Sequence, residues 1–208
     1  MNKAKPTLKA ATLLWLLAAC STAHAADPLE GRELVEPATG QAAPEALAGE
    51  YPPEQVEQGR YLVGLLGCGN CHTDGALAGK PNPARLLAGS ATGIARSDPT
   101  SVSYPGVVFP ANLTPDDETG IGKWSLEQID TMLRSGTNRH GQRTLPVMPW
   151  PNYTQLRPED TEAIAMYLKS LPPVKHKVPA GVQPGKKSKA PYVHFGVYRS
   201  TKKNDHGR

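Results

Sequence analysis

The sequence predicts a mainly α fold in which three or more helices are joined by long loops. Three segments of the 208-residue chain carry apolar residues at the three- and four-residue spacing of an amphipathic helix. The rest shows no strand-rich region and no internal repeat, and its 20 glycines and 21 prolines favour ordered loops over continuous helix. A chain of this length suits one domain with extensions.

The first predicted helix begins at Pro53 and runs into Cys68. Its apolar face contains Val56, Gly59, Leu62, Val63 and Leu66. A glycine inside a helix costs about 1 kcal/mol relative to alanine. We therefore expect another helix to cross close to the backbone at Gly59.

The second predicted helix covers residues 125–135. Ser125 and Gln128 have the spacing of a capping box, and Gly136 supplies a C-terminal stop. The apolar stripe of this helix contains Leu126, Ile129, Met132 and Leu133. The third helix begins at Pro158. Its apolar face contains Ile164, Tyr167, Leu168 and Leu171.

Two cysteines and a histidine follow the first helix, in the run Cys68-Gly69-Asn70-Cys71-His72. A Cys-x-x-Cys-His run is the attachment motif of a c-type haem. Thiols three residues apart on a helical turn share one face, where each can add to a vinyl group of one haem. The sequence therefore predicts one covalent haem c on Cys68 and Cys71, with His72 as an axial iron ligand.

Two other uses of this run are weaker. A zinc site needs four nitrogen or sulfur ligands, and Cys20, the third cysteine of the chain, falls in the leader segment. A thioredoxin-like dithiol needs a βαβ setting, which the sequence does not show. A metal-ligating histidine is commonly oriented by a carbonyl, and we expect Pro81 or Pro83 to supply the one for His72.

The other side of the iron has several candidate ligands, namely Met132, Met148, Met166, His140, His176 and His194. Met132 and Met166 lie on predicted helices, where packing explains them. Met148 stands between Pro146 and Pro149 in a stiff, non-helical loop that can hold a weak thioether ligand in place. The residues alone therefore favour Met148, with His140 as its rival and a buried, gap-filling role as the alternative.

The N-terminus has the pattern of an export signal. Lys3, Lys5 and Lys9 precede an apolar stretch over residues 10–19, and Ala23-His24-Ala25 resembles a cleavage site. We expect a signal peptide over residues 1–25 and a periplasmic location. In the alternative, residues 1–19 form a lipoprotein signal, Cys20 is lipidated, and the protein is anchored to a membrane.

Charge divides the remaining chain. Residues 26–172 carry 11 basic and 18 acidic side chains, whereas residues 173–208 carry nine basic side chains and one acidic side chain. We expect a linker over residues 26–52, a haem domain over 53–174 and a basic C-terminal extension over 175–208. Residues 192–198 alternate like a strand with one apolar face. Because the domain is acidic and the extension basic, we expect the extension to fold back on the domain. A disordered tail and docking to an acidic partner or anionic lipid are the alternatives.

Separated motifs between residues 53 and 174 resemble a known family. They are Asn112-Leu113-Thr114-Pro115-Asp116, Thr119-Gly120-Ile121-Gly122-x-Trp124, Met148-Pro149-Trp150-x-x-Tyr153 and Tyr167-Leu168-x-x-Leu171-Pro172, together with the haem motif. The chain resembles class I cytochromes c, and more narrowly the haem domains of cytochrome c subunits of periplasmic membrane-bound dehydrogenases. That resemblance implies a cytochrome c-type fold, Met148 as the distal iron ligand, and a crossing of the first and third helices at Gly59 and Tyr167. Further candidates for haem contact are Asn112, Trp124, Trp150 and Tyr153, for which packing is the alternative.

A haem with histidine and methionine ligands has no open iron position, which favours electron transfer over catalysis. We expect a non-enzymatic electron carrier, either free or as the cytochrome subunit of a dehydrogenase. Its partners are expected to be redox proteins such as a dehydrogenase, an oxidase or another cytochrome, with no nucleic acid, and with a membrane only if Cys20 is lipidated. The alternative is a haem enzyme or gas-binding sensor with a displaceable distal ligand.

Overall fold

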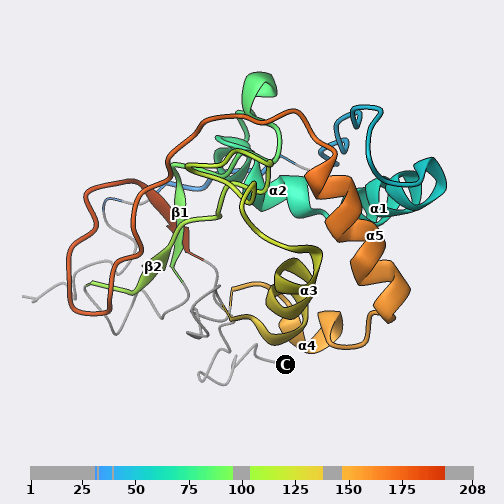
Figure 1. Cartoon of the computed structure of the whole chain (residues 1–208). Helices are drawn as coiled ribbons and strands as arrows, with labels where there is room; N and C mark the ends of the chain where they lie inside the picture. The colour runs from blue at the N-terminus through green and yellow to red at the C-terminus, as the bar shows by residue number, and fades with distance from the viewer. Residues whose placement is uncertain (1–30, 32, 39, 96–103, 138–146, 195–208) are drawn as a thin grey trace, which may run out of the picture.

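The computed structural model describes residues 31, 33–38, 40–95, 104–137 and 147–194. The protein is mainly helical with a small sheet, and the helices and the sheet lie at opposite ends of the molecule (Figure 1). Its described elements are α1 (Pro53–Leu65), α2 (Cys68–His72), β1 (Gly93–Ala95), β2 (Val107–Val108), α3 (Leu126–Ser135), α4 (Trp150–Tyr153), α5 (Pro158–Lys169) and β3 (Tyr192–His194), with 3-10 turns at Ala76–Ala78 and Pro83–Arg85. Within these residues, no helix is both long and apolar enough to cross a membrane.

The three predicted helices are present. α3 has the expected capping box between Ser125 and Gln128, and Gly136 ends it in the left-handed conformation. α1 is shorter than predicted, because it ends at Leu65 instead of running into Cys68. Gly67 adopts a φ of 67°, which starts α2 as a separate turn in a new direction.

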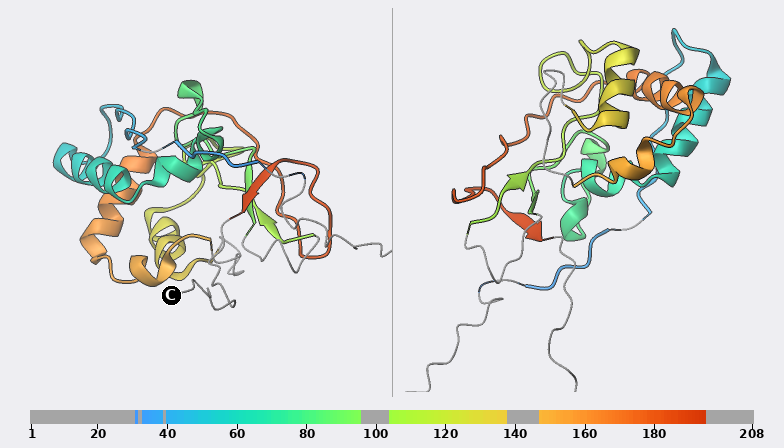
Figure 2. Two further views of the ribbon diagram at one scale, coloured as in Figure 1. Left: turned by 180° about the vertical axis from the view of Figure 1, so that it is seen from behind. Right: turned by 90° about the horizontal axis from the view of Figure 1, so that it is seen from below.

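α1 and α5 cross at Gly59, as the sequence predicted (Figures 1 and 2). A Cβ atom built on Gly59 would lie 2.0 Å from the carbonyl oxygen of Ala163 and 2.7 Å from the Cβ of Tyr167. The two backbones are therefore nearly in contact, and glycine is the residue that permits it. This contact places the end of α1, and with it α2, against the core.

One hydrophobic core joins the helices to the loops between them. α1 contributes Leu62 and Val63, α3 contributes Ile129 and Leu133, and α5 contributes Ile164, Ala165, Tyr167 and Leu168. Leu87, Leu113, Ile121 and Leu171 enter the same cluster from loops. The long segment around residues 75–115 therefore contributes to the core through its described parts, residues 75–95 and 104–115.

Of the small sheet, only β3 was predicted, as part of the strand pattern over residues 192–198, whereas β1, β2 and their pairing were not. Its order is β2-β1-β3, with Ile94 opposite Val108 in antiparallel register and opposite Val193 in parallel register. β1 is buried at all three positions and therefore shows no alternation in sequence. The pairing between β1 and β3 joins residues about a hundred positions apart, which local patterns do not reveal.

The extension folds back, as expected, over its described residues. β3 pairs with β1, and Val182 exchanges two backbone hydrogen bonds of 2.8 Å with Val107. Residues 195–198, the second half of the predicted strand, lie outside the described residues. Backbone pairing attaches the extension, and Lys175 adds an exposed ion pair with Glu118 at 2.6 Å.

The segment expected to be a linker packs against the domain in its described part. The hydroxyl of Tyr167 donates to the carbonyl of Pro44 at 2.6 Å, and the N–H of Leu47 donates to the carbonyl of Ser170 at 2.8 Å. Ala43 and Ala46 lie on the hydrophobic core. The domain boundaries themselves stay a prediction.

Gly59→Ala should destabilise the protein by about 3 kcal/mol, at the upper end of what overpacking costs, because its methyl group would displace the α5 backbone. Gly64→Ala is the matched control in the same helix, since its Cβ would lie 3.9 Å from the nearest atom, the Cβ of Ala43. That control should be neutral or stabilising by up to about 1 kcal/mol. Urea denaturation measures both, and equal stabilities of the two variants would contradict the backbone contact.

Candidate haem site

The candidate site begins at α2, a single helical turn that carries Cys68, Cys71 and His72. Both cysteines are free thiols and partly buried. Burial raises the pKa of Cys68 to about 12 and also raises the pKa of Cys71. Both groups are therefore neutral near pH 7, and Cys68 packs against the hydrophobic core.

His72 is 8% exposed, and its ring orientation is set by one hydrogen bond. Nδ1 lies 2.8 Å from the carbonyl oxygen of Ala111. Because a carbonyl only accepts, Nδ1 carries the proton and donates it. Burial lowers the pKa of His72, and the bond to Ala111 only partly offsets this, so the ring is neutral at pH 7.

A neutral imidazole protonated at Nδ1 has a lone pair on Nε2. Among the described residues, Nε2 has no hydrogen-bond partner. This is the tautomer of a histidine that ligates a metal through Nε2. The orienting carbonyl is that of Ala111, so the expectation of Pro81 or Pro83 was wrong. The expectation chose a carbonyl close to His72 in sequence, whereas Ala111 lies 39 positions after it.

The loop after Ala111 is held rigidly by the motif residues. Asn112 is 2% exposed, and its side-chain oxygen accepts from the N–H of Thr114 at 2.9 Å and from its hydroxyl at 2.8 Å. Its Nδ2 donates to Thr119 Oγ1 at 3.0 Å and to the carbonyl of Val174 at 2.7 Å. These four bonds account for the buried amide within the protein.

A group of charged and polar residues lies around Asp74, two residues after the end of α2. Asp74 accepts from the guanidinium of Arg85 at 2.7 Å and from the N–H of Ala91 at 2.9 Å. Burial alone would raise the pKa of Asp74, but the Ala91 and Arg85 hydrogen bonds and the nearby His176 hold it below its ordinary value. Arg85 also reaches Nε2 of His176 at 3.2 Å.

α4 contributes Trp150 and Tyr153 to the site. Tyr153 is 6% exposed, and burial followed by the nearby sulfurs of Cys68 and Cys71 raises the pKa of its phenol. The ring of Trp150 covers Gly136, where an added Cβ would lie 2.5 Å from its Cδ2. Its Nε1 is buried and has no hydrogen-bond partner within the described residues.

Met148 is half-buried and is separated from α4 by Pro149 alone. Its carbonyl accepts from the N–H of Trp150 at 2.9 Å, which makes a tight turn around Pro149. The ligation of iron by Met148 stays a prediction, as does each predicted haem contact. Trp124 is half-buried, packs on the core, and accepts from Lys169 Nζ at 3.2 Å through its carbonyl.

The other candidate ligands have different surroundings. Met132 packs against the core from α3, and Met166 is 8% exposed on α5. His176 uses both ring nitrogens, since Nδ1 donates to the carbonyl of Ala88 at 2.8 Å and Nε2 accepts from Arg85. His194 lies on β3 with its ring against Tyr192, and His140 falls outside the described residues.

The donor set fits a covalent haem. Two thiols share one turn, and a neutral imidazole beside them offers Nε2. The buried indole N–H of Trp150 has no acceptor among the described residues, and a haem carboxylate can supply one. In the described part of the chain, no group of three or more histidine, cysteine, aspartate or glutamate side chains comes together as a metal site.

Similarity to known proteins agrees with this donor set. The chain is 32% identical over 132 residues to a nicotinate dehydrogenase subunit of Pseudomonas putida, a match that covers 64% of this chain and 10% of that protein. It is 32% identical over 120 residues to the cytochrome c subunit of alcohol dehydrogenase (quinone) of Gluconobacter oxydans. That match covers 57% of this chain and 22% of that protein. It is 33% identical over 113 residues to the fructose dehydrogenase cytochrome subunit of Gluconobacter japonicus. That match covers 54% of this chain and 20% of that protein.

This chain resembles the cytochrome c subunits of dehydrogenases. A cytochrome c subunit holds haem c covalently, which is the cofactor that the Cys68 to His72 run predicts. The chain spans less than a quarter of the length of these three relatives, so the resemblance concerns a domain of each. No known family profile matches the chain.

Sequence reasoning missed two parts of the site, namely Ala111 and the group of Asp74 with Arg85, and it considered His176 only as an iron ligand. None of them stands in a periodic pattern or a recognised motif. The one available signal was the density of hydrogen-bonding residues between Asn112 and Thr119, which indicates a loop held by its own side chains.

Asp74→Asn should destabilise the protein by about 1–3 kcal/mol at pH 7, because it removes a carboxylate that accepts two hydrogen bonds. The pKa of Asp74 is lower in the folded protein than in the unfolded chain, so its contribution is present above about pH 4 and disappears as the pH falls further. The difference from wild type should therefore shrink at pH 3. Urea denaturation at the two pH values measures this.

The control is Glu118→Gln, which removes the exposed ion pair with Lys175 and should change stability little. An equal loss for the Asp74 variant at pH 7 and pH 3 would show that the carboxylate charge is not what stabilises the site.

Proposed function

We propose that this chain is a monohaem c-type cytochrome that transfers electrons between redox proteins of the periplasm. One observation carries the proposal: His72 is fixed by Ala111 with Nε2 free of any described partner, on the same turn as two thiols. Cys68 and Cys71 would hold the haem as thioethers, and His72 would be its proximal ligand. The similarity to cytochrome c subunits supports the same assignment.

Met148 is proposed as the second axial ligand. It precedes α4, and the Tyr153 side chain of that short helix is close to the sulfurs of Cys68 and Cys71. The turn at Pro149 restricts the backbone of Met148, which suits a weak thioether donor. Bound haem with these ligands supplies a reversible one-electron change and no open iron position.

The aromatic side chains would complete the haem surroundings. The Nε1 of Trp150 is a buried donor suited to a haem carboxylate, and Tyr153 and Trp124 would pack at the ring edge. Asn112 would act mainly through the loop that it holds. Such an enclosure excludes water from one side of the haem and leaves electron exchange to an exposed edge.

A dehydrogenase is the proposed electron donor. The named relatives are subunits of nicotinate, alcohol and fructose dehydrogenases, and each match covers one part of a longer protein. We propose that residues 1–25 direct export, or that residues 1–19 do so with lipid on Cys20, and that residues 53–174 form the haem domain. Transient redox partners commonly meet over small interfaces, which this chain is large enough to supply.

Met148→Ala should abolish the weak sulfur-to-iron charge-transfer band in the optical spectrum of the ferric protein, because no thioether would remain on the iron. The reduced variant should then bind carbon monoxide rapidly, whereas the reduced wild type should not. Met132→Ala is the control, since Met132 packs on the core and the band should persist in that variant.

The opposite pattern would favour the alternative function. A wild-type protein that lacks the band and binds carbon monoxide rapidly when reduced has a displaceable distal ligand. It would then be a haem enzyme or a gas-binding sensor, and not an electron carrier. Loss of the band in Met132→Ala with retention in Met148→Ala would contradict the ligand assignment alone.

A further inference from the structure

A segment of three residues that follows α5 connects the two loops that enclose His72. These residues, Val174, Lys175 and His176, are called the clasp below. They include the first residues of the basic extension, which had no assigned role. The clasp bonds to the Ala111 loop on one side and to the loop around Ala88 on the other.

On the first side, the clasp binds the loop that carries the Ala111 carbonyl. The carbonyl of Val174 accepts from Nδ2 of Asn112 at 2.7 Å, and its N–H donates to the hydroxyl of Thr114 at 3.1 Å. Asn112 and Thr114 are 2% and 1% exposed, so water does not replace these bonds. Asn112 directly follows Ala111, so its position sets the direction of that carbonyl.

On the second side, the clasp binds the loop that carries the backbone contact to His72. The ring of His176 donates from Nδ1 to the carbonyl of Ala88 at 2.8 Å. The next residue, Gly89, donates its N–H to the carbonyl of His72 at 2.7 Å. His72 is therefore held through its ring by one loop and through its backbone by the other.

The hydroxyl of Thr119 joins these interactions. It accepts from Nδ2 of Asn112 at 3.0 Å and from the N–H of His176 at 3.0 Å. It donates to Oδ1 of Asp116 at 2.6 Å, and the same carboxylate oxygen accepts from the N–H of Thr119 at 2.7 Å. One side-chain oxygen thus links the clasp to the loop of Asn112.

We propose that the clasp is a positioning element that sets the hydrogen bond from His72 Nδ1 to Ala111, and through it the reduction potential of the haem iron. This inference rests on the proposed function, in which Nε2 of His72 ligates that iron. A stronger hydrogen bond from Nδ1 gives the imidazole more electron density and makes it a more basic ligand. A more basic ligand favours the ferric state and lowers the potential.

The experiment compares Thr119→Val with Thr119→Ser in the haem-loaded full chain. Valine has nearly the shape of threonine but lacks the hydroxyl that both Asn112 and His176 use, whereas serine keeps it. The Thr119→Val variant should raise the potential, so that the ratio of reduced to oxidised protein at a fixed applied potential rises by about threefold to tenfold. Thr119→Ser should restore the wild-type value. Spectroelectrochemical titration measures the ratio.

Ser125→Ala controls for loss of stability. It removes the capping box of α3, which lies outside the clasp, and should leave the potential unchanged. His176→Ala is the second variant, because it removes the Ala88 and Arg85 bonds from a half-buried side chain. It should shift the reduction potential in the same direction. If Thr119→Val yields no haem-loaded protein, His176→Ala tests the proposal by itself.

Unchanged reduction potentials in haem-loaded Thr119→Val and His176→Ala would overturn the proposal that the clasp sets the potential. An equal shift in Ser125→Ala would also overturn it, because general loosening would then explain the effect. Failure of the proposed function looks different, since the wild type itself would carry no covalent haem. The two results are therefore separable in one set of proteins.

Discussion

The contact between α1 and α5 at Gly59 is the constraint on which the other parts depend. Because a backbone carbonyl of α5 occupies the space where a side chain would be, the two helices approach more closely than side chains allow. Tyr167 is fully buried at this crossing and also reaches Pro44, so the N-terminal segment is attached to the same point. The position of the end of α1 then determines where α2 lies.

With α2 in that position, the two loops that contact His72 determine how this histidine can act. The left-handed Gly67 turns the chain at the end of α1, so that His72 faces the Ala111 carbonyl and not the solvent. Burial keeps its imidazole neutral, and the carbonyl selects the tautomer. These two effects together make a buried histidine into a candidate ligand. Neither effect alone would do so, because a neutral ring with the other tautomer would present Nε2–H.

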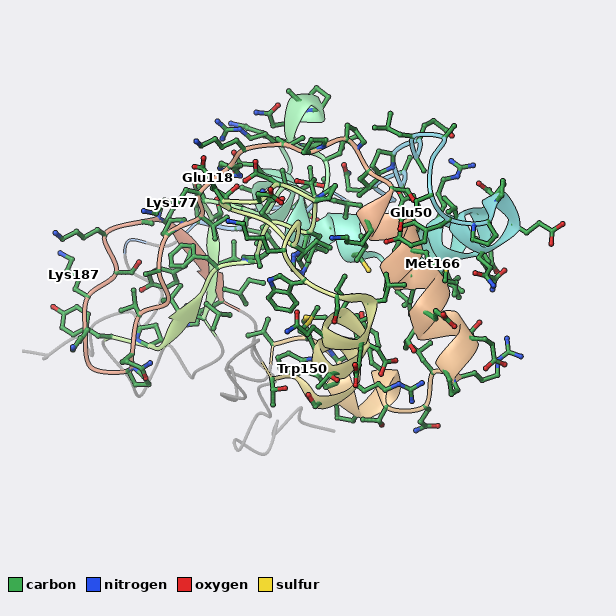
Figure 3. All side chains as sticks on the ribbon, viewed as in Figure 1. Glu50, Glu118, Trp150, Met166, Lys177 and Lys187 are labelled. Atoms are coloured by element: carbon green, nitrogen blue, oxygen red, sulfur yellow. The ribbon has the colours of Figure 1, made fainter. Side chains whose placement is uncertain are left out.

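Charges of the domain and of the extension are not fully separated in the fold, since Glu118 of the domain pairs with Lys175 of the extension. Lys177 and Lys187 lie on the side of the sheet, whereas Glu50 lies near α1 and α5 (Figure 3). Opposite charge between the domain and its extension predicted that the extension folds back, and β3 confirms this for its described residues. The physical cause is different, however, because backbone pairing with β1 and Val107 carries the attachment. The exposed pair of Lys175 with Glu118 contributes little to it.

Local patterns by themselves determined the helices, the cap at Ser125, the haem-attachment run and the need for a close approach at Gly59. Each of these depends on residues within a few positions, so periodicity and spacing report it. The tertiary structure alone decided which carbonyl orients His72, that residues 93–95 pair with both Val107–Val108 and the extension, and that Val174 and His176 reach the site. Those contacts join residues about 15 to 100 positions apart. Their partners are often backbone groups, which every residue carries and which leave no mark in the sequence.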